Sequence, residues 1–286
     1  MQTVRRVAEL RAQVRAWRAA GERVALTPTM GALHAGHLAL LTTAGGAASR
    51  LVATIFVNPT QFGEGEDFGD YPRDEARDLA MLAEGGCDLV FAPSVEAMYP
   101  PGFATEVHVR GLTDVLCGAA RPGHFDGVAQ VVTKLLNQAG ADVAVFGEKD
   151  WQQLIVIRRL ARDLDIATEI LGAPTEREPD GLARSSRNIY LTEAERAAAP
   201  ALYQALMAAA REIATGAEAR SVCQRHAAAV EAAGFAAPEY LECRTADALA
   251  PVERWAPERP ARVFGAARLG RARLIDNVPV ISEETA

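Results

Sequence analysis

Residues 23–41 constrain the fold of this chain more than any other stretch. They begin with a short apolar run, residues 24–26, which has the length and composition of a buried strand. Pro28 and Gly31 are expected to end that strand, and helical spacing of apolar residues resumes at Gly36. A strand, a turn and a helix in this order predict the first βα unit of an α/β protein.

Two histidines, His34 and His37, lie three residues apart where this helix should begin. That spacing places both side chains on one side of the first helical turn. The backbone N–H groups and the positive dipole end of a helix N-terminus favour an anion. The pattern therefore indicates a phosphate site, although two surface or helix-capping histidines would produce the same spacing without any ligand.

The composition narrows the class of protein. A chain of 286 residues is long enough for about two domains, and 49% hydrophobic with 23% charged residues is typical of a globular protein. The net charge of −7 argues against a nucleic-acid partner. No run approaches the roughly 20 apolar residues of a membrane span. The four cysteines lack zinc-ligand spacing and are expected to be free, buried thiols. We expect a cytoplasmic protein with neither a nucleic-acid nor a membrane partner.

Two further apolar runs, residues 51–57 and 142–146, predict central strands of a parallel sheet. Ligands of open parallel sheets gather at the carboxyl ends of the strands. Amides there can bind a hydroxyl or a carboxylate, and a lysine can bind a phosphate. Taken alone, either string could equally be an ordinary polar turn. The polar residues in these places are Asn58 and Gln61 after the first run, and Lys149, Asp150 and Gln153, with Gly147, after the second.

The alternation of strand and helix stops near Pro174, which predicts two domains. Residues 1–175 are expected to form a Rossmann-like parallel-sheet domain. Residues 176–286 are expected to form a smaller α+β C-terminal lid domain.

Several local features are predicted within these domains. In the first domain, residues 63–73 should form a surface loop that acts as a flap, and residues 105–110 alternate like a strand. The helix that begins at Gly36 should lose its pattern at Gly45. In the second domain, Thr192 should cap a helix that Pro200 interrupts, and a second helix and short antiparallel strands should follow.

Near the start of the second domain, Ser185, Ser186 and Arg187 follow one another. Two hydroxyls and a planar guanidinium can form a phosphate clamp, because the serines each donate one hydrogen bond and the arginine donates a fork of two. On its own, this tripeptide is more often a solvated loop.

Five strings together carry a resemblance to a known family. The string of residues 28–37 resembles the His-x-Gly-His turn of the class I nucleotidyltransferases and, at its full length, the pantothenate synthetase family. The strings of residues 58–62, 121–128, 147–154 and 184–188 resemble the same family. In the fourth string, Trp151 replaces the usual tyrosine.

The resemblance implies an ATP-dependent ligase of pantothenate and coenzyme A biosynthesis. Such an enzyme condenses pantoate with β-alanine through a pantoyl adenylate and releases AMP and pyrophosphate. It implies Mg²⁺ as a cofactor and a homodimer. His37, His34, Lys149 and Arg187 are implied as catalytic residues. The implied ATP contacts are Met30, Gly31, His34, Gly36, His37, Gly147, Glu148, Lys149, Asp150, Glu176, Arg184, Ser185, Ser186 and Arg187. The implied pantoate contacts are Gln61, Gln153 and Asn58, and Gln61 is also implied to bind β-alanine.

The chain departs from the family pattern at three places. Family members carry an acidic pair associated with magnesium where this chain has Arg77 and Asp78, so only Asp78 can be the metal ligand, and Mg²⁺ is otherwise expected to bind through ATP. Arg184 replaces a usual methionine, and Glu176 stands where a valine often contacts adenosine.

Two other functions fit the first string. Another adenylyl or cytidylyl transferase would share the His-x-Gly-His turn but would not require Asn58, Gln61 and Gln153 to converge. A non-catalytic nucleotide sensor on the same fold would bind ATP without turning it over.

Overall fold

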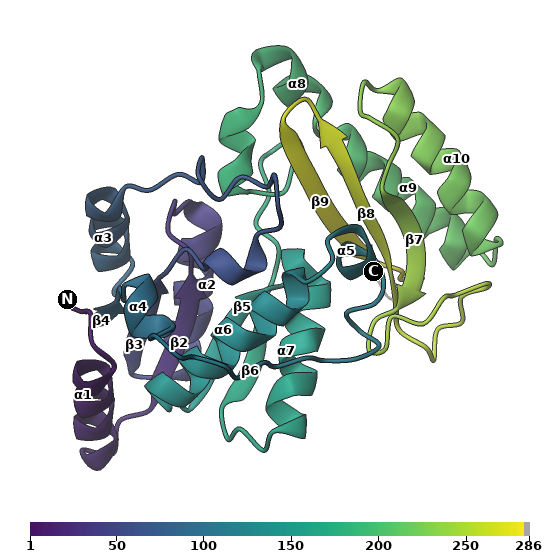
Figure 1. Cartoon of the computed structure of the whole chain (residues 1–286). Helices are drawn as coiled ribbons and strands as arrows, with labels where there is room; N and C mark the ends of the chain where they lie inside the picture. The colour runs from purple at the N-terminus through teal and green to yellow at the C-terminus, as the bar shows by residue number, and fades with distance from the viewer. Residues whose placement is uncertain (283–286) are drawn as a thin grey trace. The chain divides into compact units, whose positions relative to one another are not determined.

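The structure is a computed structural model that describes residues 1–282. The chain divides into two compact units (Figure 1). Unit 1 consists of Met1–Asp114, Arg121–Glu148 and Gln153–Pro174. Unit 2 consists of Val115–Ala120, Lys149–Gln152 and the chain from Thr175 onward.

Unit 1 is built on a six-stranded parallel sheet. The strand order is β1-β4-β3-β2-β5-β6. From β2 the chain moves outward through β3 to β4, and it then returns to β5 on the other side of β2. The topological switch point therefore lies between β2 and β5, which is where open α/β sheets bind ligands. The strands are β1 (Gln2–Val4), β2 (Val24–Thr29), β3 (Arg50–Ile55), β4 (Leu89–Phe91), β5 (Val143–Gly147) and β6 (Glu169–Ala173).

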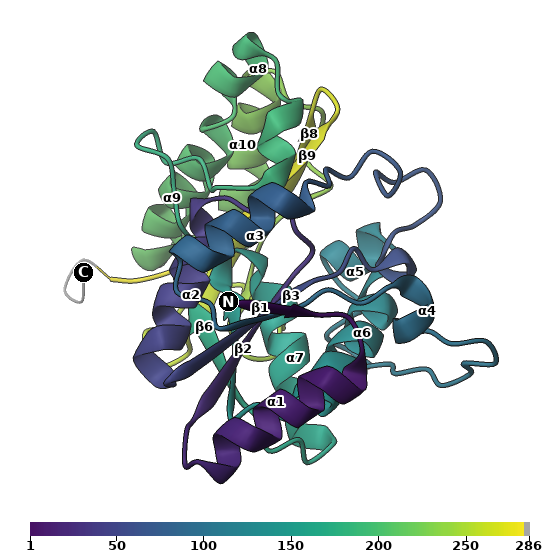
Figure 2. The ribbon, with the colours of Figure 1, turned by 90° about the vertical axis from the view of Figure 1, so that its left-hand side faces the viewer.

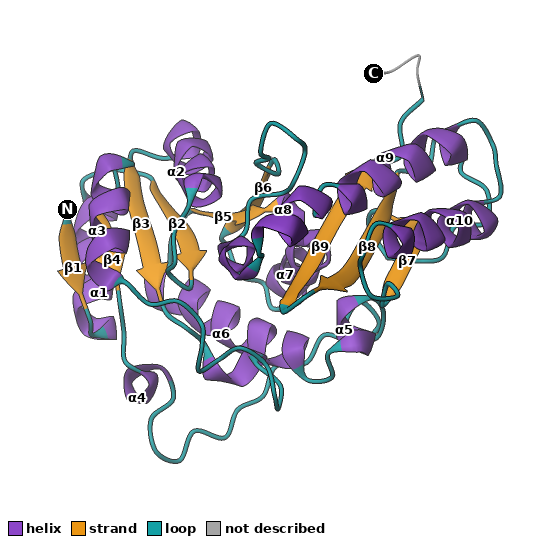
Figure 3. Cartoon of the chain, turned by 90° about the horizontal axis from the view of Figure 1, so that it is seen from above, coloured by secondary structure: helices purple, strands orange, loops and turns teal. Residues whose placement is uncertain are grey.

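Helices cover both faces of this sheet. Figures 2 and 3 show α2 on one face of β2 and β3 and α6 on the other. Leu41 and Ala44 of α2 are fully buried against the strands, and much of α6 is buried as well. Coverage of both faces explains the nearly continuous apolar character of the central strands. The remaining elements follow the same alternation: α1 (Val7–Ala19), α2 (Ala35–Ala47), η1 (Pro59–Gln61), α3 (Glu75–Glu84), α4 (Val95–Met98), α6 (His124–Ala139), η2 (Glu148–Asp150) and α7 (Trp151–Asp163).

Strand β2 runs through Pro28 to Thr29, so the expectation that Pro28 ends the strand is wrong. The parallel register explains why. Thr29 O accepts from Phe56 N next to β3, so Pro28, one residue earlier, faces β5. The pairing of β2 with β5 covers only Ala25 and Leu26. The N–H that proline lacks would therefore point beyond the last ladder bond on that side, and no hydrogen bond is lost.

The apolar pattern of α2 is lost at Gly45 and Gly46 as expected, since Ala44 is its last buried residue and the helix ends at Ala47. The expected strand at residues 105–110 is wrong, because these residues form no strand within the described chain. Only Val109 of that segment is buried, so its alternation does not follow a buried sheet face.

Unit 2 contains a three-stranded antiparallel sheet in the order β7-β8-β9. Helices α9 and α10 pack on it, and its core is rich in alanine and leucine. The expected cap is confirmed, since Thr192 Oγ1 accepts a hydrogen bond from Glu195 N and the Glu195 carboxylate accepts one from Thr192 N. The expected break at Pro200 is confirmed as well. The elements are α5 (Cys117–Ala120), η3 (Ser186–Tyr190), α8 (Glu193–Ala198), α9 (Ala201–Ala214), α10 (Ala219–Ala232), β7 (Tyr240–Thr245), β8 (Ala261–Leu269) and β9 (Ala272–Pro279).

The sequence places the domain boundary between residues 175 and 176, and contacts in the structure divide the chain between Pro174 and Thr175. Two short excursions into unit 2 were not anticipated. Trp151 Nε1 donates to Ala246 O at 2.8 Å, and the Arg262 guanidinium lies 4.0 Å from the centre of the Trp151 ring. Cys117 Sγ lies 2.9 Å from the Tyr240 hydroxyl. These long-range contacts have no signature in the local sequence.

Candidate active site

The turn after β2 is held in an unusual backbone conformation. Gly31 and Ala32 both have positive φ angles, 80° and 51°. The Asp78 carboxylate fixes this turn by accepting from Ala32 N at 2.9 Å and from Leu33 N at 2.8 Å. A Cβ atom on Gly31 would lie 2.7 Å from Asp78 Oδ2, so the carboxylate can occupy this position only because residue 31 has no side chain. The turn delivers His34 to the start of α2.

His34 and His37 form a reciprocal cap at the start of α2. Gly36 N donates to His34 Nδ1 at 3.1 Å, and His34 N donates to His37 Nδ1 at 3.3 Å. A ring nitrogen that accepts a hydrogen bond carries no hydrogen, so each neutral ring has its hydrogen on Nε2. The two ring centres are 4.2 Å apart. The helix mouth therefore presents two imidazole donors beside its own N–H groups, which suits a phosphate.

Asn58, at the end of β3, is the centre of a buried hydrogen-bond network. Its side-chain oxygen accepts from the Tyr99 hydroxyl at 2.8 Å and from Thr60 Oγ1 at 3.0 Å. Its nitrogen donates to Gln61 Oε1 and to Gly127 O, both at 3.1 Å. The residue is only 1% exposed. These contacts favour a role in positioning Gln61, and direct binding of pantoate by Asn58 stays a prediction.

Gln61 follows the end of β3 and contacts the turn after β2. Its Nε2 donates to Met30 Sδ at 3.3 Å, in the turn after β2. Its backbone oxygen accepts from Arg121 Nη2 at 3.4 Å and is 2.9 Å from His124 Nδ1. Sequence-predicted residues from two neighbouring strand ends, Met30 with Asn58 and Gln61, are thus brought together. The amide of Gln61 is half-buried and oriented by both neighbours.

The loop of residues 63–73 is tied to this site by an ion pair. The Glu66 carboxylate accepts two hydrogen bonds from the Arg121 guanidinium. Nε donates to Oε1 at 2.6 Å, and Nη2 donates to Oε2. Burial alone would raise the pKa of Glu66, but the hydrogen bonds and charge of Arg121 lower it to about 2. Both side chains are largely covered. The carboxylate is therefore ionised at neutral pH and fixes this part of the loop to the start of α6.

Helix α6 approaches the Gln61 loop closely at Gly127. A Cβ atom there would lie 2.3 Å from Thr60 O and 2.6 Å from Gln61 Cα. Glycine therefore allows the helix backbone to touch the loop and to accept the Asn58 hydrogen bond.

The third group of predicted residues lies at the end of β5. Gly147 ends the strand, and Glu148 begins the short helix η2. Gln153 lies in the first turn of α7 and is half-buried. Since β3, β2 and β5 are neighbours in a parallel sheet, the predicted residues that follow them emerge at one edge of unit 1.

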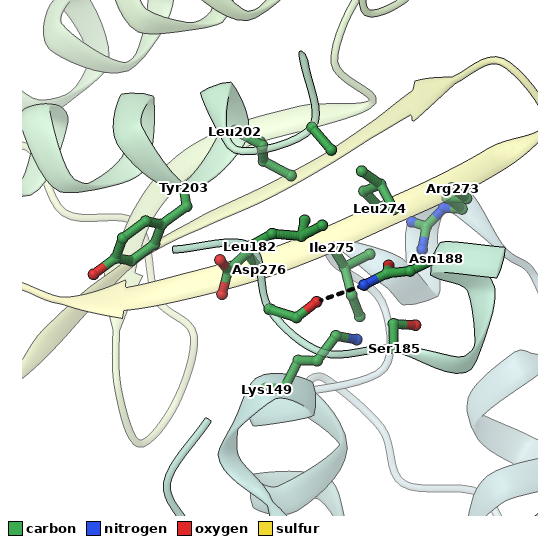
Figure 4. A pocket seen from close by; sticks show the side chains of 12 residues that line it. Lys149, Leu182, Ser185, Asn188, Leu202, Tyr203, Arg273, Leu274, Ile275 and Asp276 are labelled. Atoms are coloured by element: carbon green, nitrogen blue, oxygen red, sulfur yellow. Dashed lines mark hydrogen bonds between the residues drawn. The ribbon is translucent and has the colours of Figure 1, made fainter. Parts of the chain in front are cut away.

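Within unit 2, Lys149 and Ser185 line one small pocket (Figure 4). The Lys149 side chain is 19% exposed, its amine is 3.9 Å from Asp150 Oδ2, and Asn277 Nδ2 fixes its backbone oxygen at 2.9 Å. Asn188 also lines the pocket and donates to Ala183 O at 3.1 Å. A lysine amine beside a serine hydroxyl can bind an anionic oxygen.

The remaining predicted residues of unit 2 lie in one segment. Ser185 Oγ accepts from Arg187 N at 3.3 Å and so caps η3, which also contains Ser186. Arg184 pairs with Glu178 at 3.1 Å. Glu176 accepts the backbone N–H of Arg184 at 2.9 Å. Their assignment to ATP stays a prediction.

Asp78 is 2% exposed, and its two oxygens serve the backbone of the turn. Within residues 1–282, no group of three or more His, Cys, Asp or Glu side chains is arranged to hold a metal ion. The donor set therefore does not fit a metal held by protein ligands alone, and Asp78 as a ligand stays a prediction. All four cysteines are buried free thiols, as expected. None of the helices in this range has the length and apolar character needed to cross a membrane.

Sequence reasoning missed Tyr99, Glu66 and Gly127 as parts of this arrangement. Tyr99 follows the end of β4 through α4, so applying the strand-end rule to every strand would have singled it out. Its pKa is raised by burial, which keeps its hydroxyl a donor to Asn58. The close approach at Gly127 and the Glu66 ion pair have no local sequence signal.

The parallel sheet, its switch point and the helix-mouth histidines define an α/β nucleotide-binding enzyme with the turn of the class I nucleotidyltransferases. The sequence profile described as pantoate-beta-alanine ligase matches residues 2–279. The chain is 58% identical over 277 residues to the pantothenate synthetase of Paramagnetospirillum magneticum, covering 97% of each chain. It is 56% identical over 281 residues to that of Caulobacter vibrioides, covering 97% of this chain and 98% of the other.

Solved structures of the same family superpose on this chain. The pantothenate synthetase of Thermus thermophilus superposes with a TM-score of 0.91 at 48% identity, covering 98% of this chain and 99% of that one. The Francisella tularensis pantoate-beta-alanine ligase, complexed with beta-gamma ATP and beta-alanine, superposes with a TM-score of 0.82 at 30% identity, covering 98% and 97%. The chain therefore belongs to the pantoate–beta-alanine ligase family. It is a ligase, and the expected ATP-dependent condensation of pantoate with β-alanine is confirmed.

Proposed function

We propose that the protein performs this condensation in two steps. First, the pantoate carboxylate attacks the α-phosphorus of ATP, the bond to pyrophosphate breaks, and pantoyl adenylate forms. Second, the β-alanine amine attacks the acyl carbon, AMP leaves, and the amine loses a proton. Neither step requires a covalent enzyme intermediate, so the protein contributes alignment and stabilisation of charge.

The observation that carries the proposal is the edge of unit 1 at the ends of β2 and β3. His34 and His37 offer Nε2 donors at the mouth of α2, which suits phosphate oxygens. Beside that turn, Gln61 offers a positioned amide, which suits the hydroxyl and carboxylate of pantoate and the β-alanine next to it. Gln153 is assigned to pantoate with it. Gly31, Gly36, Gly147 and Glu148 are assigned to ATP with Met30.

In unit 2, Lys149 and Arg187 are assigned to stabilise phosphate charge, and the hydroxyls of Ser185 and Ser186 to donate single hydrogen bonds. The shared pocket of Lys149 and Ser185 supports this assignment. Asp150 is assigned to the ribose hydroxyls.

Mg²⁺ is proposed to bind mainly through the phosphates of ATP and water, in keeping with its preference for phosphate and water ligands. The occupied oxygens of Asp78 support this view. A cytoplasmic location, expected from the sequence, and a homodimer, implied by the family resemblance, are further parts of the proposal. Light scattering on the purified protein would measure the assembly state directly.

Product analysis tests the proposed reaction. Mass spectrometry of a mixture of ATP, pantoate and β-alanine with the enzyme should find pantothenate, AMP and pyrophosphate in equal amounts. A nucleotide-capped product would instead indicate nucleotidyl transfer, and ADP with inorganic phosphate would indicate activation through an acyl phosphate. Either result would contradict the adenylate route.

A further inference from the structure

We propose that Arg177 is a positioning residue that holds the ATP-binding segment of unit 2 in place. The inference rests on the proposed function, since it takes the phosphate contacts of Ser185, Ser186 and Arg187 from it. Arg177 itself belongs to none of the motif strings.

Residues 176–184 form a small hairpin. Arg184 N donates to Glu176 O at 2.9 Å, and Glu178 N donates to Leu182 O at 2.8 Å. The turn closes at Gly181, where φ is 94°. The two ends of the hairpin, Glu176 and Arg184, are therefore adjacent, and both occupy positions that the family resemblance implies for ATP contacts. The chain leaves the hairpin directly into Ser185.

The Arg177 side chain fastens this hairpin to β9. Nη1 donates to Asp276 Oδ2 at 2.6 Å, and Nη2 donates to Asp276 Oδ1 at 2.9 Å. Nη1 also donates to Gly181 O at 3.0 Å, so one guanidinium holds both the turn and the strand. The Asp276 side chain is only 4% exposed and the Arg177 side chain 20%. A forked ion pair with so little solvent has a defined geometry, unlike a surface pair.

Tyr203 of α9 also contacts Arg177, and we call the group of Arg177, Asp276 and Tyr203 the clasp. The Arg177 guanidinium lies 3.9 Å from the centre of the Tyr203 ring, within the range of a cation–π contact. The ring also lies against the hairpin turn, because a Cβ atom on Gly181 would be 2.4 Å from Tyr203 Cδ1. The hairpin is thus held between a strand and a helix of the same unit.

The clasp adjoins the pocket of Lys149 and Ser185. Tyr203 and Asp276 line that pocket as well (Figure 4). A shift of the hairpin would move Ser185 against Lys149 without removing either group. The KM for ATP should therefore change, and the KM values for pantoate and β-alanine should not.

The test compares Michaelis constants for Arg177→Lys with those for the wild type. Lysine keeps the charge but cannot make the fork. We expect the KM for ATP to rise about tenfold, the equivalent of losing one aligned charge-assisted hydrogen bond. The KM values for pantoate and β-alanine should stay within about twofold. Arg225→Met is the matched control, because Arg225 is an exposed member of an ion pair with Glu212 in the same unit.

An unchanged KM for ATP, or equal rises for all three substrates, would overturn the role of Arg177. If Arg177→Lys does not fold, the KM for ATP of Tyr203→Leu is compared with that of Tyr203→Phe instead. The leucine variant should have a KM for ATP at least about threefold above that of the phenylalanine variant, which keeps the ring. Equal values would overturn the proposal. Absence of pantothenate with the wild type would instead refute the proposed function.

Discussion

His37 combines a helix-capping role with a proposed catalytic one, and substitutions can separate the two. Asparagine can replace Nδ1 as the acceptor of His34 N, but it has no group at the position of Nε2. We expect His37→Asn to fold like the wild type and to lose about 2.7–4 kcal/mol of transition-state stabilisation, as expected for one preorganised donor. The measurement is kcat/KM for ATP beside a thermal unfolding curve. Wild-type turnover would remove His37 from the mechanism.

Asn58 provides the second prediction at this scale. Asn58→Ala leaves the Tyr99 hydroxyl and Gly127 O without their buried partner, so the free energy of unfolding should fall by about 1–3 kcal/mol. The KM for pantoate should rise as well, because Gln61 loses its orienting contact. Urea denaturation and steady-state kinetics measure the two effects. Asn137→Ala, at an exposed position of α6, is the control and should show neither.

The positions of the polar residues that follow β2, β3 and β5 could be predicted from the sequence, because each of these motifs lies immediately after an apolar run; their roles stay predictions. Their partners could not be predicted. Asp78 was singled out as a metal ligand, yet its oxygens bind the backbone of a turn 45 residues earlier in the chain. Asn58, which the resemblance assigns to pantoate, has its side-chain oxygen and nitrogen bonded within the protein. Local sequence gives the chemistry of a side chain but not the groups that already occupy it.

At the scale of elements, the close approach of α6 to the Gln61 loop predicts that residue 127 must be glycine. Gly127→Ala would force Cβ against Thr60 O, so the helix or the loop must move. We expect a loss of about 1–3 kcal/mol in unfolding free energy and weaker pantoate binding. Gly46→Ala is the control, since nothing lies within 4 Å of the added atom in α2. That variant should be as stable as the wild type or gain about 0.5–1 kcal/mol. Equal stabilities of the two variants would contradict the close contact.

The ion pair between the 63–73 loop and α6 predicts a pH dependence. Because the pKa of Glu66 is about 2 in the folded protein against an ordinary 4.5, the unfolded chain binds the proton more tightly. The stabilisation is therefore complete above about pH 4.5 and is lost as the pH falls towards 2. Urea denaturation of the wild type and Glu66→Gln should differ most at pH 6, and the difference should shrink as the pH is lowered from 4.5 towards 2. Glu64→Gln, an exposed neighbour, makes the same charge change as a control. A difference that does not depend on pH would argue against the pair.

Most elements could be predicted because their apolar periodicity matches their burial. The exceptions have physical causes. Strand β2 passes Pro28 because the missing N–H faces an unpaired side, and residues 105–110 alternate without a partner strand. Strand β1 was missed because it has only three residues, one of them buried. Pairing is a property of two segments, and one segment does not reveal it.

For the whole molecule, the division of labour between the two units explains the order of the motifs. The histidines and the amides that we assign to substrate follow strands of unit 1, and the serines and arginine that we assign to phosphate follow the boundary. Lys149–Gln152 belong to unit 2, and Lys149 lines the same pocket as Ser185. Sequence reasoning recognised both motifs, but only the contacts of Trp151 and Lys149 reveal this exchange.

Isotope exchange tests the adenylate step, on which the account depends, more directly than any other measurement. With ATP, Mg²⁺ and pantoate but no β-alanine, the enzyme should return labelled pyrophosphate to ATP, because formation of the pantoyl adenylate is reversible. Omission of pantoate should abolish the exchange. Exchange without pantoate, or none with it while pantothenate is still produced, would contradict the account.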